Sequence, residues 1–272
     1  MEIFESTNWI CNKCKTHNSH YLYCTGCQDY SNDTHYKINA DKIKQFTSFN
    51  KVIPLFFKVI HPVDDIMMKL NLEIIKKNNI TDIILISNYC NNDFLIKWIK
   101  IISRETSAKL YVNFLTNLVK STIYYLEIKD FVSGIMLDEY FKKKETYINP
   151  LLVLISSMKK EHLLICGFDF KYQHEIEIEE YPYLLNTASK YVDLLCITSK
   201  SGGIPNSDKV NIIKSFYPKN ICISAGINDI NINMFNNSSF MIGSFILNDE
   251  ILDINNINII NNYINSKIIT TS

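Results

Sequence analysis

The sequence has few glycines, almost no arginine and no excess of charge of either sign. Its 272 residues include only 7 glycines, and 28 basic residues balance 28 acidic ones to a formal net charge of zero. A balanced charge removes the broad electrostatic attraction by which many proteins bind nucleic acids or anionic membranes. We therefore expect neither nucleic acid nor a membrane surface as the main partner.

Long apolar runs are also missing. No stretch of roughly 18 uncharged apolar residues occurs, so the sequence predicts no transmembrane helix. The opening residues, MEIFESTNWICNKC, are acidic and lack the apolar centre of a secretory signal. These absences predict an intracellular, cytoplasmic location, where cysteines serve as thiols or metal ligands rather than disulfides.

Half of the cysteines lie together near the N-terminus, in the pattern CNKC, nine residues, CTGC. Two CxxC pairs at this spacing are typical of a structural zinc site, because four thiolates satisfy a tetrahedral Zn²⁺ ion. The segment also has too few apolar residues to fold without a metal. We therefore predict Zn²⁺ as a structural cofactor. Its predicted ligands are Cys11, Cys14, Cys24 and Cys27.

The four remaining cysteines are scattered through the rest of the chain. Cys166, Cys196 and Cys222 lie inside apolar runs and are predicted to be small buried hydrophobic residues. Cys90 ends such a run, where it could face the mouth of a site.

The cysteine-rich segment resembles the small zinc fingers of the Ran-binding, nuclear-pore type. Those fingers carry Trp two residues before the first Cys and Asn four residues after the second, and Trp9 and Asn18 match both positions. The resemblance implies ubiquitin, Ran or single-stranded RNA as a partner. The finger contains no Arg, which RNA-binding members use, so we expect a structural or protein-docking finger.

The chain divides into a finger (1–30), a polar linker (31–50) and a large domain (51–268). In the large domain, apolar runs alternate with helix-like segments. The apolar runs are 52–60, 82–87, 109–115, 131–137, 162–168, 192–197, 220–225 and 239–244. The helix-like segments are 64–77, 93–103, 118–128, 150–160, 181–190, 207–216, 228–235 and 255–264. Continuous apolar strands alternating with helices predict an α/β fold, a (β/α)₈ TIM barrel. A doubly wound open sheet is the alternative.

A TIM barrel carries its function at the C-terminal ends of the strands. Four of the seven glycines lie at the ends of predicted strands six to eight, where barrels often hold a phosphate on backbone N–H groups. We therefore predict a phosphate site there, with nearby hydroxyls and a lysine as added donors. Its residues are Thr198, Lys200, Ser201, Gly202, Gly203, Ser224, Gly226, Gly243 and Ser244. The alternative is that these are ordinary turn glycines.

Acid–base chemistry is predicted at the other strand ends. Asp169 and Lys171 form a base and electrophile pair, and the lysine could instead form a Schiff base. Asp138 is a second acid or base, or holds a cation with Glu139. His61 is a general acid–base candidate. Alternatively, Asp169 and Lys171 form a solvated ion pair, Asp138 and Glu139 begin a polar loop, and His61 caps the first helix.

Two asparagines at strand ends complete the predicted site. Asn88 and Asn113 are expected to hydrogen-bond the hydroxyl groups of a ligand.

The strand-end motifs resemble the BtpA family of barrel proteins, in order, from residue 60 to about 246. The matching stretches are VIHPVDD, SNYCNNDF, YVNFLTN, FDFKYQH, TSKSGGIP, SAGIND and MIGSF. Ser87 stands where the family has Glu, and one glycine of the TSKSGGIP loop is missing. The resemblance implies a barrel related to phosphoribosylanthranilate isomerase and the tryptophan synthase α chain, with a phosphate-type ligand but no defined reaction.

Two functions follow. The first is binding of a phosphosugar or nucleotide, with isomerase, lyase or hydrolase chemistry and a finger for targeting or docking. The alternative is a non-catalytic assembly or adaptor protein on a degenerate barrel, whose finger binds a ubiquitin-like protein or RNA.

Overall fold

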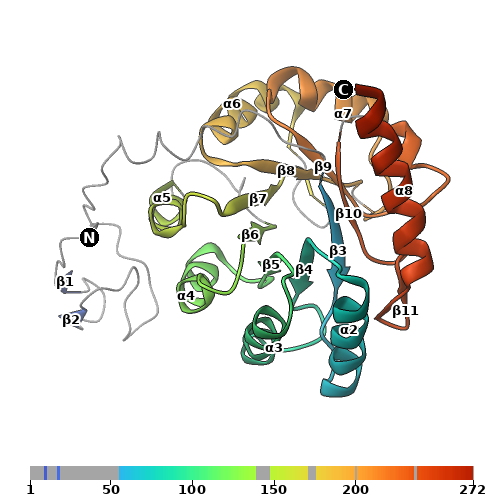
Figure 1. Cartoon of the computed structure of the whole chain (residues 1–272). Helices are drawn as coiled ribbons and strands as arrows, with labels where there is room; N and C mark the ends of the chain where they lie inside the picture. The colour runs from blue at the N-terminus through green and yellow to red at the C-terminus, as the bar shows by residue number, and fades with distance from the viewer. Residues whose placement is uncertain are drawn as a thin grey trace.

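The computed structural model describes residues 9–10, 17–18, 55–138, 148–170, 176–199, 201–235 and 238–271. Within these residues, eight parallel strands close into a barrel in the order β10-β3-β4-β5-β6-β7-β8-β9. The helices surround the strands (Figure 1). The predicted TIM barrel is confirmed, and the closed sheet excludes the open-sheet alternative.

Each barrel strand lies inside one of the predicted apolar runs. Such runs form strands because the sheet is covered on both faces, so neither face of a strand needs polar residues. The strands are β3 (Phe56–Ile60), β4 (Ile83–Ile86), β5 (Leu110–Asn113), β6 (Gly134–Leu137), β7 (Leu163–Gly167), β8 (Leu194–Ile197), β9 (Ile221–Ser224) and β10 (Ser239–Ile242).

Most of the predicted helices are also present. They are α2 (Asp65–Asn78), α3 (Asn92–Glu105), α4 (Leu118–Ile128), α5 (Ile148–Ser157), α6 (Tyr181–Tyr191), α7 (Ser207–Phe216) and α8 (Ile254–Thr271). A short 3₁₀ helix, η2 (Ile178–Glu180), leads into α6. Asp64, Asn91, Asn117 and Asn206 cap four of the helices through their side-chain oxygens.

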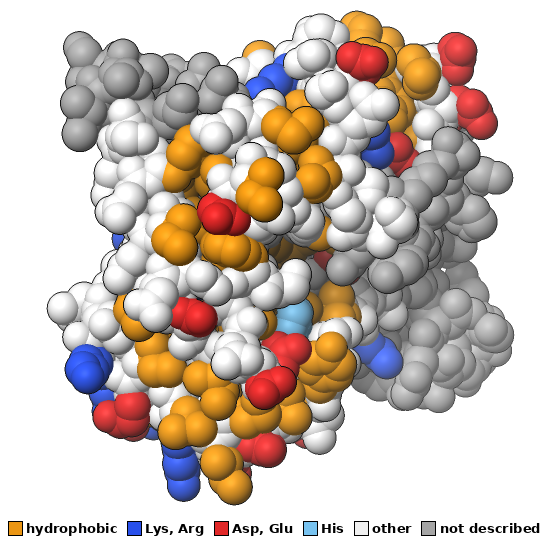
Figure 2. All heavy atoms as spheres, turned by 90° about the vertical axis from the view of Figure 1, so that its right-hand side faces the viewer, with side chains coloured by type: hydrophobic (Ala, Val, Ile, Leu, Met, Phe, Trp, Pro, Cys, Tyr) orange, Lys and Arg blue, Asp and Glu red, His pale blue; other side chains and the backbone are white. Residues whose placement is uncertain are grey.

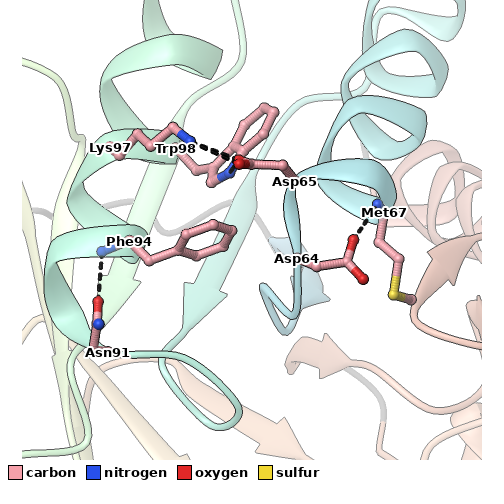
Figure 3. A network of polar contacts seen from close by, with 7 residues as sticks. All are labelled: Asp64, Asp65, Met67, Asn91, Phe94, Lys97 and Trp98. Atoms are coloured by element: carbon pink, nitrogen blue, oxygen red, sulfur yellow. Dashed lines mark hydrogen bonds and ion pairs between the residues drawn. The ribbon is translucent and has the colours of Figure 1, made fainter.

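Figure 3 shows how the starts of α2 and α3 are held together. Asp64 accepts a hydrogen bond from the Met67 N–H at 2.8 Å and so caps α2, which settles the cap in favour of Asp64 rather than His61. Asp65 accepts from Lys97 Nζ at 2.7 Å and from Trp98 Nε1 at 2.9 Å. The Lys97 ammonium lowers the pKa of the Asp65 carboxyl. The two helices are thereby tied at the end from which the candidate site opens.

The predicted helix over 228–235 is wrong. Only a 3₁₀ turn, η3 (Ile232–Met234), forms there. Asn228 Oδ1 accepts from the N–H groups of Ile230 and Asn231, and Asn231 Oδ1 accepts from the Asn228 N–H. Asparagine side chains that bond nearby backbone in this way compete with helical hydrogen bonds.

A two-stranded hairpin lies between the last barrel strand and α8, and the sequence analysis missed it. It pairs β11 (Leu247–Asn248) with β12 (Ile251–Leu252). Asp249 and Glu250 form the turn, with positive φ angles of 48° and 62°. This geometry belongs to tight hairpin turns, in which Asn, Asp and Gly are the usual residues. Strands of two residues each are too short to give a recognisable strand pattern in the sequence.

The core has two layers. One cluster fills the barrel interior and includes Phe57, Ile84 and Met241, while a larger one packs the strands against the helices. Residues of the two clusters alternate along each strand, because successive side chains of a strand point to opposite faces. Cys166, Cys196 and Cys222 are buried as predicted. None of the described helices is long and apolar enough to cross a membrane.

The described part of the N-terminal region is one antiparallel pair, β1 (Trp9–Ile10) with β2 (His17–Asn18). Trp9 pairs with Asn18, the two residues that carry the zinc-finger resemblance. The predicted zinc ligands and the linker 31–50 lie outside the described residues, so the zinc site stays a prediction.

Candidate functional site

The C-terminal ends of the barrel strands bring most of the predicted site residues to one face. Residues two positions apart on a strand share a face, so the interior side chains Val59, Tyr111, Met136, Cys196, Cys222 and Met241 predict which strand-end residues point inward. Those residues are His61, Asn113, Asp138, Thr198, Ser224 and Gly243. The barrel therefore directs polar side chains from five strands, and a glycine from a sixth, toward its axis.

Asn113 and Asp138 contact each other at the ends of β5 and β6. Asn113 Nδ2 donates to Asp138 Oδ1 at 2.7 Å, and Asn113 Oδ1 accepts from the Leu115 N–H at 3.0 Å. Asn113 is buried. The Asn113 amide therefore orients the Asp138 carboxylate and holds the loop after β5, so binding a ligand is not its sole role.

Asp169 forms a buried ion pair that the sequence did not indicate. Its Oδ2 lies 2.6 Å from Lys209 Nζ and accepts from the Tyr181 hydroxyl at 2.9 Å. The Lys209 ammonium also donates to the carbonyl oxygens of Asp169 and Thr198, at 3.1 and 3.4 Å. All three of its donors are thus occupied. The predicted partner Lys171 lies outside the described residues, so that pairing remains untested.

This ion pair fixes the loop that follows β7. Asp169 has a positive φ of 45°, which turns the chain back on itself. Phe170 is consequently buried among the interior side chains of the barrel. Gly167 makes room for it, since a Cβ there would lie 3.0 Å from Phe170 Cγ. The interior beneath the β7 side of the candidate site is therefore filled with hydrophobic side chains.

The loop TSKSGGIP after β8 closes on itself. The Gly202 N–H donates to the Ser199 carbonyl at 3.0 Å, and the Gly203 N–H donates to Ser199 Oγ at 2.7 Å. Ser199 N–H in turn donates to the Gly203 carbonyl, and the Ser199 and Ser201 hydroxyls are 3.0 Å apart. The glycine N–H groups predicted to bind phosphate are thus used inside the loop. Lys200 lies outside the described residues.

Gly226 is required by a close approach of two loops. A Cβ at this position would lie 2.7 Å from the Ile204 nitrogen and 3.0 Å from the Gly203 carbonyl carbon. Its φ of +71° is also unfavourable for other residues. The loop after β9 therefore rests directly on the loop after β8.

Backbone donors remain at the ends of β9 and β10. Among the described residues, the N–H groups of Gly226, Gly243 and Ser244 have no hydrogen-bond acceptor. The Ser224 hydroxyl at the end of β9 likewise makes no hydrogen bond to a described residue. These two strand ends are neighbours in the barrel. The arrangement offers three N–H groups and a hydroxyl to an anion, which is the chemistry a phosphate requires.

His61 adds an imidazole beside these donors, and Glu250 lies against it. His61 Nδ1 is 3.0 Å from Glu250 Oε2, and the ring makes an edge contact with Tyr89, with centroids 5.6 Å apart. On the face that Figure 2 shows, a histidine side chain is visible between acidic and hydrophobic side chains. Glu250 comes from the turn of the β11–β12 hairpin.

The strand end after β4 contributes less. The Ser87 hydroxyl donates to the Phe114 carbonyl at 2.7 Å, and Asn88 is exposed. Partial burial raises the pKa of the Cys90 thiol, so it is not an activated nucleophile. Asn88 stays a predicted ligand contact, and its side chain makes no hydrogen bond to a described residue.

Two strongly shifted pKa values belong to residues just before or early in barrel strands, away from the candidate site. Burial lowers the pKa of Lys58 to about 8, although nearby Asp82 opposes the shift. Burial also raises the pKa of Asp193 to about 6, against the hydrogen bond that Asp193 accepts from the Leu164 N–H. Residues at that end of a TIM barrel serve stability rather than catalysis.

Sequence reasoning missed Lys209 and Glu250. Lys209 lies in the first turn of α7, 40 residues from Asp169, where a lysine looks like an ordinary solvated side chain. Glu250 is separated from His61 by 189 residues. The one local signal was the pair Asp249-Glu250 between short apolar pairs, which is compatible with a hairpin turn.

No family model matches the chain, and no curated protein matches it either. Solved structures do resemble its fold. KGPDC from Streptococcus mutans has a TM-score of 0.57 and 6% identity, covering 79% of this chain and 99% of that one. (S)-3-O-geranylgeranylglyceryl phosphate synthase from Thermoplasma acidophilum, in complex with sn-glycerol-1-phosphate, has a TM-score of 0.50 and 14% identity, covering 75% and 89%.

Orotidine 5'-monophosphate decarboxylase from Methanocaldococcus jannaschii is a third similar structure. Its TM-score is 0.53 and its identity 14%, with 72% of this chain and 91% of that chain covered. At these identities the likeness shows the fold alone, because unrelated activities share the TIM barrel. The chain is a (β/α)₈ barrel of the kind found in these enzymes, and the resemblance to the BtpA family remains a prediction.

Proposed function

We propose that the barrel binds the phosphate group of a small phosphorylated molecule, of phosphosugar or nucleotide type, at the ends of β9 and β10. The observation that carries the proposal is the set of N–H groups at Gly226, Gly243 and Ser244, which have no acceptor among the described residues, beside the Ser224 hydroxyl. Two of the similar barrel enzymes have phosphate in the names of their substrates or ligands. The sequence motifs SAGIND and MIGSF, which resemble those of the BtpA family, supply these same residues.

The rest of the ligand would then extend over the barrel axis toward β3 and β6. The groups available there are the His61 imidazole and the Asp138 carboxylate, which Asn113 orients. Such groups suit proton transfer in an isomerase, lyase or hydrolase. Asp169 is already neutralised by Lys209, so we assign it to shaping the site.

A charge placed at the proposed phosphate site tests this assignment. Ser244→Asp puts a carboxylate beside the unpaired N–H groups, and we expect it to weaken binding of inorganic phosphate about tenfold, or about 1.4 kcal/mol. Ser201→Asp is the matched control, since Ser201 is also exposed but lies on the self-bonded loop after β8. Binding is measured by isothermal titration at constant ionic strength. Weaker binding in Ser201→Asp with normal binding in Ser244→Asp would return the site to the loop after β8.

We further propose that Cys11, Cys14, Cys24 and Cys27 hold a structural Zn²⁺ ion. The register that pairs Trp9 with Asn18 supports a finger, because it brings together the two residues that carry the resemblance. We expect the purified full chain to contain one zinc per molecule by elemental analysis, and Cys11→Ser to lower that content. A zinc-free wild-type chain would refute the site.

The second candidate is an adaptor protein on a barrel that has lost its chemistry, with a protein partner docked on the finger. Two observations favour it: Ser87 replaces the family's acid and bonds backbone, and Phe170 fills part of the barrel interior. Absence of phosphate binding in the titration above, together with capture of a partner that is lost in Cys11→Ser, would favour this function over the first.

A further inference from the structure

Glu250 and His61 form a contact that joins two distant parts of the chain at the candidate site. The imidazole Nδ1 and the carboxylate Oε2 are 3.0 Å apart, and the two side chains are 22% and 27% exposed. The pair is therefore partly shielded yet reachable by a ligand. Histidine with a carboxylate on one ring nitrogen is a recurring arrangement in proton transfer.

The contact determines which ring nitrogen carries the proton. A carboxylate can only accept hydrogen bonds, so Nδ1 of the neutral imidazole must be the protonated nitrogen. Nε2 then carries the lone pair. Among the described residues, Nε2 has no hydrogen-bond partner. His61 thus presents Nε2 with its lone pair available toward the candidate site.

The hairpin that supplies Glu250 is held in place by a buried side chain. Asn71 of α2 is 1% exposed, and its Nδ2 donates to the Glu250 carbonyl at 2.9 Å. Its Oδ1 accepts from the Leu252 N–H at 2.9 Å. These two bonds hold the C-terminal side of the turn against the helix that follows β3. The carboxylate is therefore positioned by the fold rather than by a mobile surface loop.

The imidazole lies next to the proposed phosphate donors. The position that a Cβ would take at Gly243 is 3.9 Å from His61 Cε1, so no side chain of that residue separates the ring from the loop. The other predicted acids are less available. Asp169 is buried and bonded to Lys209 and Tyr181, and Asp138 is bonded to Asn113.

We infer that His61 is the proton-transfer group of the site and that Glu250 is its positioning residue. Nε2 takes a proton from a C–H or O–H of the bound ligand, whose electron pair stays on the ligand, and the imidazolium returns the proton in the following step. The ligand's identity as a phosphorylated molecule rests on the proposed function. The arrangement of His61 and Glu250 does not depend on the proposed function.

The tautomer of His61 tests the pair directly. In ¹⁵N NMR spectra of the full chain at a pH where His61 is neutral, we expect the Nδ1–H form to dominate. Glu250→Ala should shift the ring toward the Nε2–H form that free histidine prefers. Asp249→Asn removes the neighbouring charge from the same turn and should leave the spectrum unchanged. A dominant Nε2–H form in the wild-type chain would overturn the inference.

Chemical modification tests the availability of Nε2 and its place beside the phosphate. Diethyl pyrocarbonate acylates unprotonated imidazole, and peptide mass spectrometry locates the product. We expect His61 to react several-fold more slowly in Glu250→Ala, because the carboxylate makes Nε2 more nucleophilic. Faster reaction in that variant would show that the contact with Glu250 only shields the ring, and would refute the positioning role.

Protection by phosphate tests whether the His61 imidazole lies beside the bound anion. Inorganic phosphate should slow acylation of His61 in the wild-type chain but less in Ser244→Asp. If phosphate binds yet leaves His61 unprotected, the inference fails while the proposed function stands. If phosphate does not bind, the proposed function fails, and the tautomer and acylation rates still decide whether the pair exists.

Discussion

Single residues in this protein take their roles from partners that are remote in sequence. Lys209 would be a surface lysine of α7 if it did not meet three oxygens at the ends of β7 and β8. Asp193 is a second example, since a carboxylate before β8 becomes buried and accepts a hydrogen bond from the Leu164 N–H. Burial then raises the pKa of the Asp193 carboxyl.

The pKa of Asp193 leads to a prediction about pH. Burial raises that pKa from 3.8 to about 6, so the folded state binds the proton more tightly than the unfolded state does. The stability that this group contributes is therefore complete below about pH 4 and is lost as pH rises through about 6. We expect Asp193→Asn, which keeps an acceptor for the Leu164 N–H, to remove this loss.

The measurement is urea unfolding of both chains across that pH range. At pH 7 the variant should be more stable by on the order of 1–3 kcal/mol. Asp229→Asn, at an exposed position, is the control for the change in net charge. Equal pH profiles for wild type and Asp193→Asn would show that the carboxyl is not perturbed by folding.

At the scale of elements, short additions to the repeating unit determine the site. The β11–β12 hairpin replaces a direct connection from β10 to α8 and brings Glu250 to His61. The loop after β9 does not form its expected helix, because asparagine side chains bond its backbone. Both departures occur at the strand ends that carry the unpaired N–H groups. The regular units elsewhere act as scaffold.

The clamp between α2 and the hairpin is testable by itself. Asn71→Ala leaves the Leu252 N–H without its acceptor in a buried position, and should cost about 2 kcal/mol of stability. We expect hydrogen exchange to accelerate at Leu252 more than in the barrel strands. Asn78→Ala removes one exposed hydrogen bond to the Ile74 carbonyl, from the same helix, and should change neither. Unchanged exchange at Leu252 in Asn71→Ala would argue against the clamp.

At the scale of the whole molecule, we expect the barrel and the predicted finger to have separate sources of stability. The barrel buries a continuous core on both sides of its sheet. The predicted finger depends on metal, because its segment has too few apolar residues. The chain has two tryptophans, with Trp9 in the finger segment and Trp98 buried in the barrel. Fluorescence can therefore distinguish the two parts.

Removal of zinc should affect one part only. We expect a chelator to change the tryptophan emission of the wild-type chain through Trp9. The variant Trp9→Phe reports Trp98 alone, and its emission should stay constant on chelation. A change in the emission of Trp9→Phe would mean that the metal also stabilises the barrel.

The pattern of the sequence was sufficient for the fold because its signals are local. Continuous apolar runs and capping residues such as Asp64 and Asn91 identify strands and helix starts from a few neighbours in the chain. The closed barrel then follows, since eight such units have few other ways to cover a parallel sheet. Their positions at the C-terminal ends of predicted strands also placed Asn113, Asp138 and Ser224 at one face.

Tertiary structure alone decided which of these residues meet. Asp169 pairs with Lys209 across 40 residues, and His61 pairs with Glu250 across 189. It also decided which glycine N–H groups remain available, since those of Gly202 and Gly203 are used within their own loop. Hydrogen bonds and ion pairs depend on distances of about 3 Å, and only the closed barrel sets such distances between residues so far apart in the chain.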